Sequence, residues 1–365
     1  MKILFLSNSF GALANFRYEL IENLCADKNN ELYLAFPFGE DTKKLDSFNL
    51  KYIDTQMTQK GKNPLSDFGL YLRYEKIISD IKPNIILSYT IKPNIYGAFA
   101  AKKNRIPIII SITGLGTALE YPGILQKITT FLYKMASKCA SIVYFQNYDN
   151  NQFFIKHGIR MKASALVPGS GVNLNKFKVL PYPDGDEVHF VMITRVLKQK
   201  GIDEYIEAAR YIRKKYPNSF FHVIGGCIDE NYLSVLLEEQ NNGTIIYEGE
   251  QSDIIKFHTI SSCTIHPSYY PEGMSNVLLE SGACGRPIIT TDRSGCREAI
   301  EDGVNGYICK QQDSKDLICQ IEKFLSLSKE QRKEMGLAGR RKIEKEFDRE
   351  IVVKHYIDSI NKYKI

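Results

Sequence analysis

The chain has 365 residues, 44% of them hydrophobic and 25% charged, which is enough apolar material for the cores of two α/β domains. Residues 1–180 carry 23 Lys and Arg against 13 Asp and Glu, and the remaining residues carry 25 against 29, so an excess of +10 is followed by one of −4. A basic first half indicates an anionic partner, and the absence of a helix-turn-helix, zinc-finger or RNP-type motif disfavours nucleic acid, so we expect a membrane surface or a phosphorylated substrate.

The sequence also restricts where the protein is located and what its cysteines can do. No apolar run reaches the roughly 20 residues that a membrane-spanning helix needs, and the apolar residues 1–7 are too short for a signal peptide. The eight cysteines show neither a Cys-x-x-Cys pair nor a Cys/His metal spacing. We therefore expect a cytoplasmic protein with reduced cysteines and no bound metal.

The first half of the chain alternates strands and helices. A hydrophobic strand at 2–7 precedes a loop and a helix that ends near residue 25. Further strands are predicted near 31–36, 50–54, 84–89, 107–112 and 140–146, and helices near 66–80, 94–104, 124–138 and 148–157. This order predicts a mostly parallel, doubly wound sheet. The first loop lacks Gly-x-Gly-x-x-Gly, so a nicotinamide dehydrogenase is disfavoured.

Loops that follow parallel strands meet at one edge of the sheet, where ligands bind. Gly11, Lys92 and Thr113 each follow a predicted strand and are expected at this edge. Arg17 lies early in the first helix, where it meets an acceptor phosphate or is simply solvated. We take Arg17 and Lys92 as candidate contacts to an anionic acceptor.

Residues 122–140 predict an amphipathic helix. Its apolar positions recur at helical spacing and lysines lie elsewhere on the wheel, while 81–180 as a whole carries 13 Lys and Arg against 2 Asp and Glu. Such a helix either lies at a membrane surface with its lysines toward lipid phosphates or turns its apolar stripe to a core.

Residues 167–186 form the clearest linker, because proline and glycine cluster there without a helical or alternating pattern. Asp184-Gly185-Asp186 suggests an Asp-x-Asp motif of the kind that holds a divalent metal beneath a diphosphate. We reject that interpretation because the motif precedes a strand instead of following one.

The second half opens with a strand at 188–193, followed by Arg195 and Lys200 and by a helix for which Asp203 is the expected N-cap. Gly225 ends a strand at 220–224, where glycine permits close backbone approach. A strand is predicted at 244–247, and a loop that contains Gln251 and Ile254 follows it.

The most informative stretch is 266–287. A strand at 263–266 ends at Pro267, and Ser275 is the expected N-cap of a short helix that stops at Gly285. Its first amides, from Asn276 and Val277 onward, have no partner in the helix and form an anion site. Glu272 precedes the helix and Glu280 lies inside it, so both can accept hydrogen bonds from the hydroxyls of a nucleotide sugar. His266 is either a structural residue near this pocket or a base.

The last part predicts a strand at 288–291, a loop at 292–298 that leads into a helix, a turn at 303–307 and helical structure from about residue 328.

The segment Pro-Glu-Gly-Met-Ser-Asn-Val-Leu-Leu-Glu at 271–280, with Arg195 and Lys200 in Arg-x-x-x-x-Lys-Gly, closely resembles retaining glycosyltransferase family 4. The resemblance implies an α/β GT-B fold of two doubly wound Rossmann-like domains that face a cleft. An acceptor-binding domain spans 1–180, a nucleotide-sugar-binding domain spans 181–340, and a helix in 341–365 crosses back to the first domain.

The resemblance also implies the roles of individual residues. Catalytic roles fall to Glu272, Arg195, Lys200 and Thr113, where Thr113 stands in place of the family's usual histidine. The nucleotide-sugar contacts, besides Arg195, Lys200 and Glu272, are Gly11, Gly225, Gln251, Ile254, Gly273, Met274, Ser275, Asn276, Val277 and Glu280. Arg195 and Lys200 would neutralise the diphosphate, so no metal cofactor is expected.

The loop Gly114-Leu115-Gly116 resembles the corresponding loop of a subgroup of this family, whose members build capsule, O-antigen or protein-glycan precursors on lipid diphosphates. The implied reaction moves a hexose or N-acetylhexosamine from a UDP-sugar to a lipid-diphosphate-linked saccharide, with retained configuration, at the inner face of the cell membrane. Two alternatives remain open: a UDP-sugar 2-epimerase of the same fold, and a non-catalytic, membrane-associated accessory protein.

Overall fold

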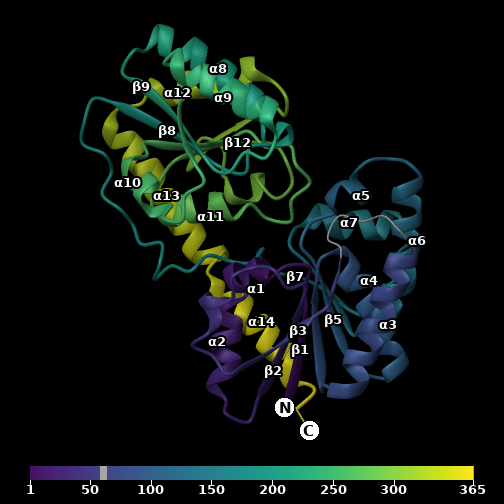
Figure 1. Ribbon diagram of the computed structural model, residues 1–365. Helices are drawn as coiled ribbons and strands as arrows, with labels where there is room; N and C mark the ends of the chain where they lie inside the picture. The colour runs from purple at the N-terminus through teal and green to yellow at the C-terminus, as the bar shows by residue number, and fades with distance from the viewer. Residues whose placement is uncertain (58–63, 365) are drawn as a thin grey trace. The chain divides into compact units, whose positions relative to one another are not determined.

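A computed structural model describes residues 1–57 and 64–364, and it divides the chain into two compact α/β units. The first unit comprises Met1–Ser170 and Arg349–Ile365, and the second comprises Gly171–Asp348 (Figure 1). The predicted α/β class is confirmed, and nearly every strand predicted from the sequence is present.

The first unit contains a seven-stranded parallel sheet in the order β3-β2-β1-β4-β5-β6-β7. Its strands are β1 (Lys2–Leu6), β2 (Glu31–Phe36), β3 (Leu50–Asp54), β4 (Ile85–Tyr89), β5 (Ile108–Ile112), β6 (Ile142–Phe145) and β7 (Ser164–Leu166). The central strands β4 and β5 are buried along their whole length, as expected for parallel strands covered on both faces.

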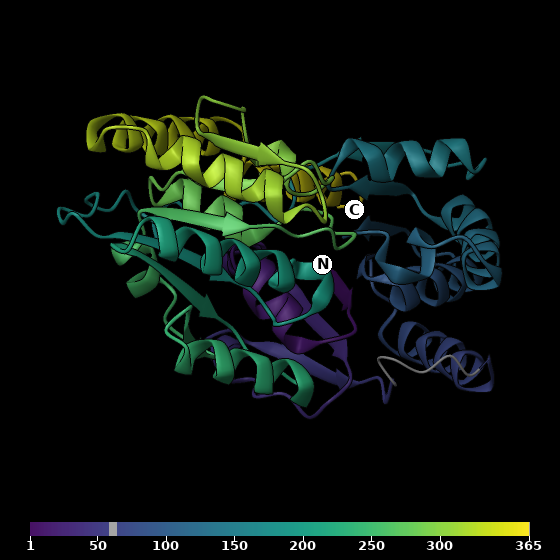
Figure 2. The same cartoon turned by 90° about the horizontal axis from the view of Figure 1, so that it is seen from above.

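Helices cover both faces of this sheet, each over a separate apolar core (Figures 1 and 2). One face carries α3 (Pro64–Ile81), α4 (Ile91–Asn104), α5 (Gly116–Glu120), α6 (Ile124–Cys139) and α7 (Tyr148–Lys156). The other face carries α1 (Phe10–Phe16), α2 (Tyr18–Ala26) and α14 (Arg349–Asn361). The sheet is therefore doubly wound, as predicted.

The C-terminal helix α14 belongs to the first unit, although the second unit precedes it in sequence. Its Val352, Val353, Tyr356 and Ile360 are buried against the sheet. The hydroxyl of Tyr356 lies 2.6 Å from that of Ser111 in β5. These contacts complete a face of the sheet that α1 and α2 cover only in part.

The second unit contains a six-stranded parallel sheet in the order β10-β9-β8-β11-β12-β13. Its strands are β8 (Val188–Ile193), β9 (Ser219–Ile224), β10 (Ile246–Gly249), β11 (Cys263–His266), β12 (Ile288–Thr291) and β13 (Gly306–Cys309). Helices α8 (Ile202–Lys215), α9 (Glu230–Asn241) and α12 (Ser314–Leu325) share one core, while α11 (Asn276–Ala283) and α13 (Lys329–Glu346) share another with the turn η3 (Arg297–Ala299). The short helix α10 (Ile255–Ile260) contributes Phe257 to a small cluster with β8 and β9.

The first boundary between the units falls after residue 170, where the sequence predicted 180, and Arg286 supplies the physical reason. Its fully buried guanidinium donates to the carbonyls of Leu180 and Pro181 and, at 2.6 Å, to that of His258. The stretch before β8 is thereby held on the second unit instead of forming a free linker. The second boundary falls at 348, beyond the predicted 340, because α13 runs to Glu346 within the second unit.

His258, which adjoins this arginine, is completely buried, and neither of its ring nitrogens has a hydrogen-bond partner in the described part of the chain. Phe177 packs edge-on against its ring. Burial, with a smaller contribution from Arg286, lowers the pKa of His258 to about 4. The imidazole is therefore neutral at physiological pH.

Three local predictions were wrong in whole or in part. Helix α8 begins at Ile202 with Gly201 as its N-cap, so Asp203 lies inside the first turn. The loop at 292–298 leads into the single turn η3 and not into a longer helix. The turn predicted at 303–307 is present at 303–305, but its last two residues begin strand β13, which pairs with β12.

Within the residues that the structure describes, no helix combines the length and the apolar character needed to cross a membrane.

Candidate active site

The candidate site of the second unit lies where β8 and β11 end. These strands are neighbours in a parallel sheet, so the turn η2 (Lys198–Lys200) after β8 and the loop 267–275 after β11 emerge at the same edge. Gly201 allows the two to touch: it has φ +78°, and a Cβ at this position would lie 2.2 Å from the carbonyl oxygen of Pro267. A residue with a side chain would push Lys200 away from the loop.

Lys200 and Glu272 form an ion pair at the centre of this edge. Their side chains are only 9% and 13% exposed. Glu272 Oε1 also lies 3.7 Å from His266 Nε2, and it accepts a hydrogen bond from Ser268 at 3.4 Å. We call these four residues, Lys200, His266, Ser268 and Glu272, the Glu272 cluster.

Electrostatics keep Glu272 ionised. Burial by itself would raise the pKa of Glu272, but the charge of Lys200 and the nearby imidazole of His266 outweigh it and lower the pKa to about 2. Burial also lowers the pKa of His266. At neutral pH the cluster thus holds a permanent carboxylate acceptor next to a cation.

Ser275 stands at the N-cap position of α11, as predicted, but its side chain makes no capping hydrogen bond. Its hydroxyl lies 3.3 Å from His266 Nε2 instead. Its backbone N–H donates to the carbonyl of Gly295 at 2.7 Å, and the N–H of Gly295 donates to Glu298 at 2.7 Å. The loop after β12 therefore fixes the start of α11, whose first amides remain without partners in the helix.

The other residues of the predicted donor site lie around this helix in different settings. Glu280 is half-buried inside α11, and Gly273 is buried beside the Glu272 cluster. The side chain of Met274 belongs to the core, where it packs with α11. Val277 and Ile254 are partly buried against the cluster that contains Ile193 and Ile224, at the ends of β8 and β9. Half-buried Asn276 has a buried side-chain oxygen without a hydrogen-bond partner among the described residues.

The nearby loops show two contacts that the sequence did not predict. A Cβ on Gly225, which has φ +145°, would lie 1.8 Å from the carbonyl oxygen of Thr194, so this glycine is required by the loop after β8 itself. Gln251 donates to the carbonyl of Glu248 at 2.6 Å and accepts from Lys256 at 2.9 Å. Both residues therefore have structural contacts in the chain, whatever ligand they meet.

Arg195 differs from Lys200 although both were predicted to bind one diphosphate. Its side chain is exposed and forms no hydrogen bond or ion pair with another residue that the structure describes. The structure brings together Lys200 and Glu272, and it leaves Arg195 outside their contacts.

Four predicted site residues belong to the first unit. The N–H of Gly11 donates to the carboxylate of Glu40 at 2.6 Å, and Thr113 is half-buried directly after β5. Lys92 forms a 2.8 Å ion pair with Asp67 of α3.

Arg17 is neither solvated nor inside a helix, contrary to the sequence interpretation. It joins α1 to α2, is 4% exposed, and stacks its guanidinium 4.5 Å from the ring centroid of Tyr89. Tyr356 contributes a second aromatic face to the same guanidinium.

No group of three or more His, Cys, Asp or Glu side chains in the described ranges is arranged to hold a metal ion. Asp184, from the rejected Asp-x-Asp motif, pairs with Lys329 at 3.0 Å.

Neither Ser268 nor Tyr270 was predicted to belong to the site. Ser268 donates a hydrogen bond to Glu272, and the ring centroid of Tyr270 lies 4.9 Å from the ammonium of Lys200. The hydrogen bond from the N–H of Ser275 to the carbonyl of Gly295 was not predicted either. The pair Tyr269-Tyr270 just before Pro271-Glu272 was the available signal, because aromatic rings in a polar loop often flank a cation.

The class of the protein follows from these features and from two family models that together span most of the chain. The description "Glycosyl transferase 4-like" matches residues 2–147, and "Glycosyl transferases group 1" matches residues 175–342. The chain belongs to this family and is a glycosyltransferase with the GT-B fold.

Curated relatives extend over nearly the full length. The chain is 29% identical to the N,N'-diacetylbacillosaminyl-diphospho-undecaprenol alpha-1,3-N-acetylgalactosaminyltransferase of Campylobacter jejuni, over 98% of this chain and 97% of the relative. It is 26% identical to the capsular polysaccharide biosynthesis glycosyltransferase CapM of Staphylococcus aureus, over 89% and 88%. Among solved structures, HepE of Anabaena in complex with UDP and glucose superimposes with a TM-score of 0.81 at 18% identity, covering 99% of this chain and all of HepE.

Proposed function

We propose that the protein transfers a hexose or N-acetylhexosamine from a UDP-sugar to a lipid-diphosphate-linked saccharide, with retained configuration. The nearly full-length Campylobacter relative, whose name specifies an N-acetylgalactosaminyl donor group and a diphospho-undecaprenol acceptor, supports the acceptor class and the type of sugar. A solved neighbour with bound UDP supports the uridine nucleotide.

The observation that carries the proposal is the Glu272 cluster at the start of α11. An ionised carboxylate accepts hydrogen bonds from sugar hydroxyls, and Lys200 beside it offers a cation to the diphosphate. The first amides of α11, which the side chain of Ser275 does not cap, and the positive end of the helix dipole add to the same attraction for phosphate. The carboxylate of Glu272 therefore suits the sugar, while Lys200 and the start of α11 suit the diphosphate.

In this proposal the chemistry needs no covalent enzyme intermediate. The acceptor hydroxyl attacks the anomeric carbon on the face that the diphosphate leaves, the bond from that carbon to the β-phosphate oxygen breaks, and the departing phosphate takes the hydroxyl proton. Lys200 and the amides of α11 stabilise the charge that develops on the diphosphate. Glu272 keeps the sugar oriented throughout.

Helix α6 provides the contact with an anionic membrane surface, at the inner face of the cell membrane. Its apolar residues point outward, because Ile124, Ile128, Phe131 and Met135 are all exposed. The buried residues of the helix are Thr129, Thr130, Tyr133, Ala136 and Ser137, of which all but Tyr133 are small. An outward apolar stripe flanked by lysines, as at Lys127, suits the boundary between lipid headgroups and chains.

The test is a donor screen by turnover with a matched pair of variants. Purified protein is incubated with UDP-, GDP- and dTDP-sugars, with and without lipid-diphosphate saccharides, while nucleoside diphosphate and lipid product are followed. We expect UDP release that depends on the acceptor. Glu272→Gln should lower kcat/KM about a hundredfold, since it removes a charge-assisted hydrogen bond and leaves Lys200 without its carboxylate.

Glu238→Gln, which neutralises an exposed carboxylate of α9, is the control and should keep full activity. Both variants are first compared by thermal midpoint and by UDP binding, so that misfolding is not mistaken for lost chemistry. Nucleotide binding without turnover under every acceptor contradicts the transferase proposal and favours an accessory protein. Isomerised UDP-sugar without an acceptor favours an epimerase.

A further inference from the structure

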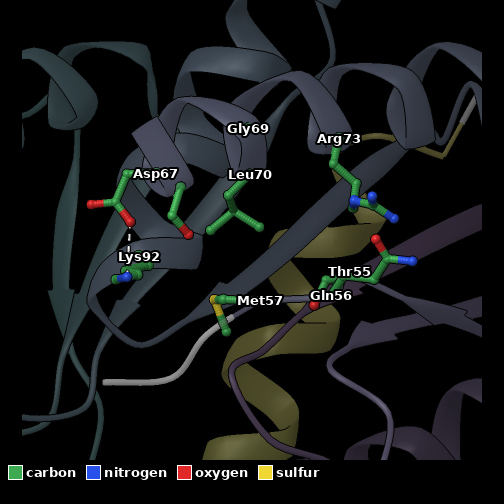
Figure 3. Close-up of a pocket in the computed structure, with 9 residues that line it drawn as sticks. Thr55, Gln56, Met57, Asp67, Gly69, Leu70, Arg73 and Lys92 are labelled. Atoms are coloured by element: carbon green, nitrogen blue, oxygen red, sulfur yellow. Dashed lines mark ion pairs between the residues drawn. The ribbon is translucent and has the colours of Figure 1, made fainter. Parts of the chain in front are cut away.

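The first unit contains a cavity of about 180 Å³ at the edge of its sheet, apart from the site described above. The residues that follow β3, the first half of α3 and the first turn of α4 form its wall. Figure 3 shows Arg73 on one side with Thr55 and Gln56, the Lys92–Asp67 pair on the other, and Leu70 and Met57 between them. Since water occupies about 30 Å³ in the liquid, the cavity has room for roughly six water molecules, the scale of a headgroup.

The charges around the cavity favour an anion. Arg73 lines it and has no carboxylate partner among the residues that the structure describes. Lys92 is held in place by Asp67, which also accepts a hydrogen bond from the hydroxyl of Tyr96 at 3.0 Å. A guanidinium offers two parallel donors to phosphate oxygens; the ammonium of Lys92 offers further donors, although Asp67 offsets its charge, so Arg73 supplies the net positive charge of the cavity.

An unpartnered hydroxyl points independently to a ligand. Thr55 lines the cavity at 1% exposure, and its Oγ1 has no hydrogen-bond partner within the described chain. A buried hydroxyl without a partner is costly, and the oxygen of a bound phosphate would accept its hydrogen bond. The next residue, Gln56, has φ +49°, an unfavourable conformation for a residue with a side chain, held by a 2.8 Å bond from its N–H to Asp54.

The surface beside the cavity is apolar. On α3, the same helix that supplies Arg73, the side chains of Leu65, Phe68 and Leu72 are 80%, 59% and 46% exposed. Their spacing places them on one stripe of the helix, next to the stripe that lines the cavity. A free phosphate makes no favourable contact with such a stripe, whereas a hydrocarbon chain attached to the phosphate can pack on it.

We propose that this cavity binds the diphosphate of a lipid diphosphate, with Arg73, Lys92 and Thr55 as its ligands and the hydrocarbon chain along Leu65, Phe68 and Leu72. The inference rests on the proposed function, since it gives the acceptor a place on the first unit. It adds Arg73, Thr55 and an apolar track to Lys92, one of the two acceptor contacts that the sequence suggested.

The test measures the binding of farnesyl diphosphate to the intact protein by calorimetry, beside farnesol and inorganic diphosphate. Arg73→Gln is the main variant, and Lys76→Gln is its control, because Lys76 is an exposed cation of the same helix outside the cavity. We expect Arg73→Gln to weaken the affinity for farnesyl diphosphate at least tenfold and Thr55→Val several-fold, while Lys76→Gln stays within twofold of the wild type.

Each contrary result overturns the inference. Equal loss in Arg73→Gln and Lys76→Gln indicates general charge attraction, and equal binding of farnesol indicates an apolar site alone. Inorganic diphosphate that binds as tightly as the lipid indicates a site for free diphosphate, and no binding of farnesyl diphosphate removes the site.

UDP-sugar turnover separates this inference from the proposed function. Lipid binding through Arg73 without turnover keeps the cavity and rejects the transferase. Turnover with the same KM for the lipid acceptor in Arg73→Gln and Lys76→Gln keeps the transferase and rejects the cavity.

Discussion

His258 shows how one buried side chain ties the stability of the second unit to pH. Its imidazole is enclosed by Phe177 and Arg286 and has no hydrogen-bond partner within the described chain. The unfolded chain takes up a proton near pH 6.5, while the folded chain does so only near pH 4. Between these values the unfolded state binds more protons, so stability falls as the pH falls.

We therefore predict that His258→Phe removes a pH-dependent loss of stability. At 1.36 kcal/mol per pH unit, the wild-type histidine costs about 3 kcal/mol between pH 6.5 and 4. Phenylalanine fills a similar space without a titrating group. Hydrogen exchange of the β11 amides, followed from pH 7 to 4, measures the effect in the second unit. The exposed His355→Phe serves as control, and a parallel pH dependence in His258→Phe and wild type would contradict the assignment.

Residue types in a motif predicted part of the candidate site, and their partners did not follow from the sequence. The motifs that join Glu272 to Glu280 and Arg195 to Lys200 drew attention to these residues, but a sequence does not show that a lysine 72 positions away is the counter-ion of Glu272. Arg17 was misread for a related reason, because a basic residue at a helix start is usually solvated. Its burial depends on Tyr89 and Tyr356, which come from distant parts of the chain.

At the scale of elements, α6 differs from a helix that packs on a core, because such a helix turns its apolar face inward and α6 turns it outward. Its exposed stripe is apolar, so its hydrophobic side chains contribute little to the stability of the folded unit. A charge on this stripe should thus cost little stability and much membrane affinity.

We predict that Phe131→Glu, at a position that is 60% exposed, lowers binding to anionic phospholipid vesicles at least tenfold. The substitution removes buried apolar area from the lipid interface and repels anionic headgroups. Vesicle co-sedimentation measures the binding, and the thermal midpoint should stay within about 2 °C of the wild type.

Leu237→Glu on α9, where Leu237 is 44% exposed, is the matched control and should bind vesicles as the wild type does. A large fall in the thermal midpoint of Phe131→Glu would show instead that the stripe supports the fold.

Element positions were the most predictable feature, because parallel strands buried on both faces are continuous apolar runs such as 108–112. Which face of an amphipathic helix turns inward was less predictable, since α6 has a small and polar inner side around Thr129. Strand β13 escaped prediction because Gly306 begins it, and glycine reads as a turn.

At the scale of the whole molecule, the first unit is assembled from two separated stretches of chain. Tyr356 of α14 is buried, bonds to Ser111, and packs near Tyr89 and Tyr144. We predict that Tyr356→Ala destabilises the first unit by about 3–5 kcal/mol, the usual cost of removing a large buried aromatic ring.

Hydrogen exchange of β5 and of β11, measured in the same sample, distinguishes the two units. Exchange in β5 should accelerate in Tyr356→Ala while exchange in β11 stays unchanged, and Tyr356→Phe should show a smaller effect from loss of the hydroxyl alone. Equal acceleration in both strands would mean that α14 stabilises the chain as one cooperative block.

The second unit is inserted between the two stretches of the first, and its two ends are joined by a β-bridge between Val172 and Asp348. Domains generally fold as they emerge during synthesis, at about 5–20 residues per second. Residues 171–348 are therefore all synthesised before α14, and most of the second unit leaves the ribosome before α14 does. The apolar face of the first sheet that α14 will cover stays exposed during that whole interval. The unit that begins first is therefore the last to be completed. A nascent chain at this stage offers a chaperone a defined place to bind.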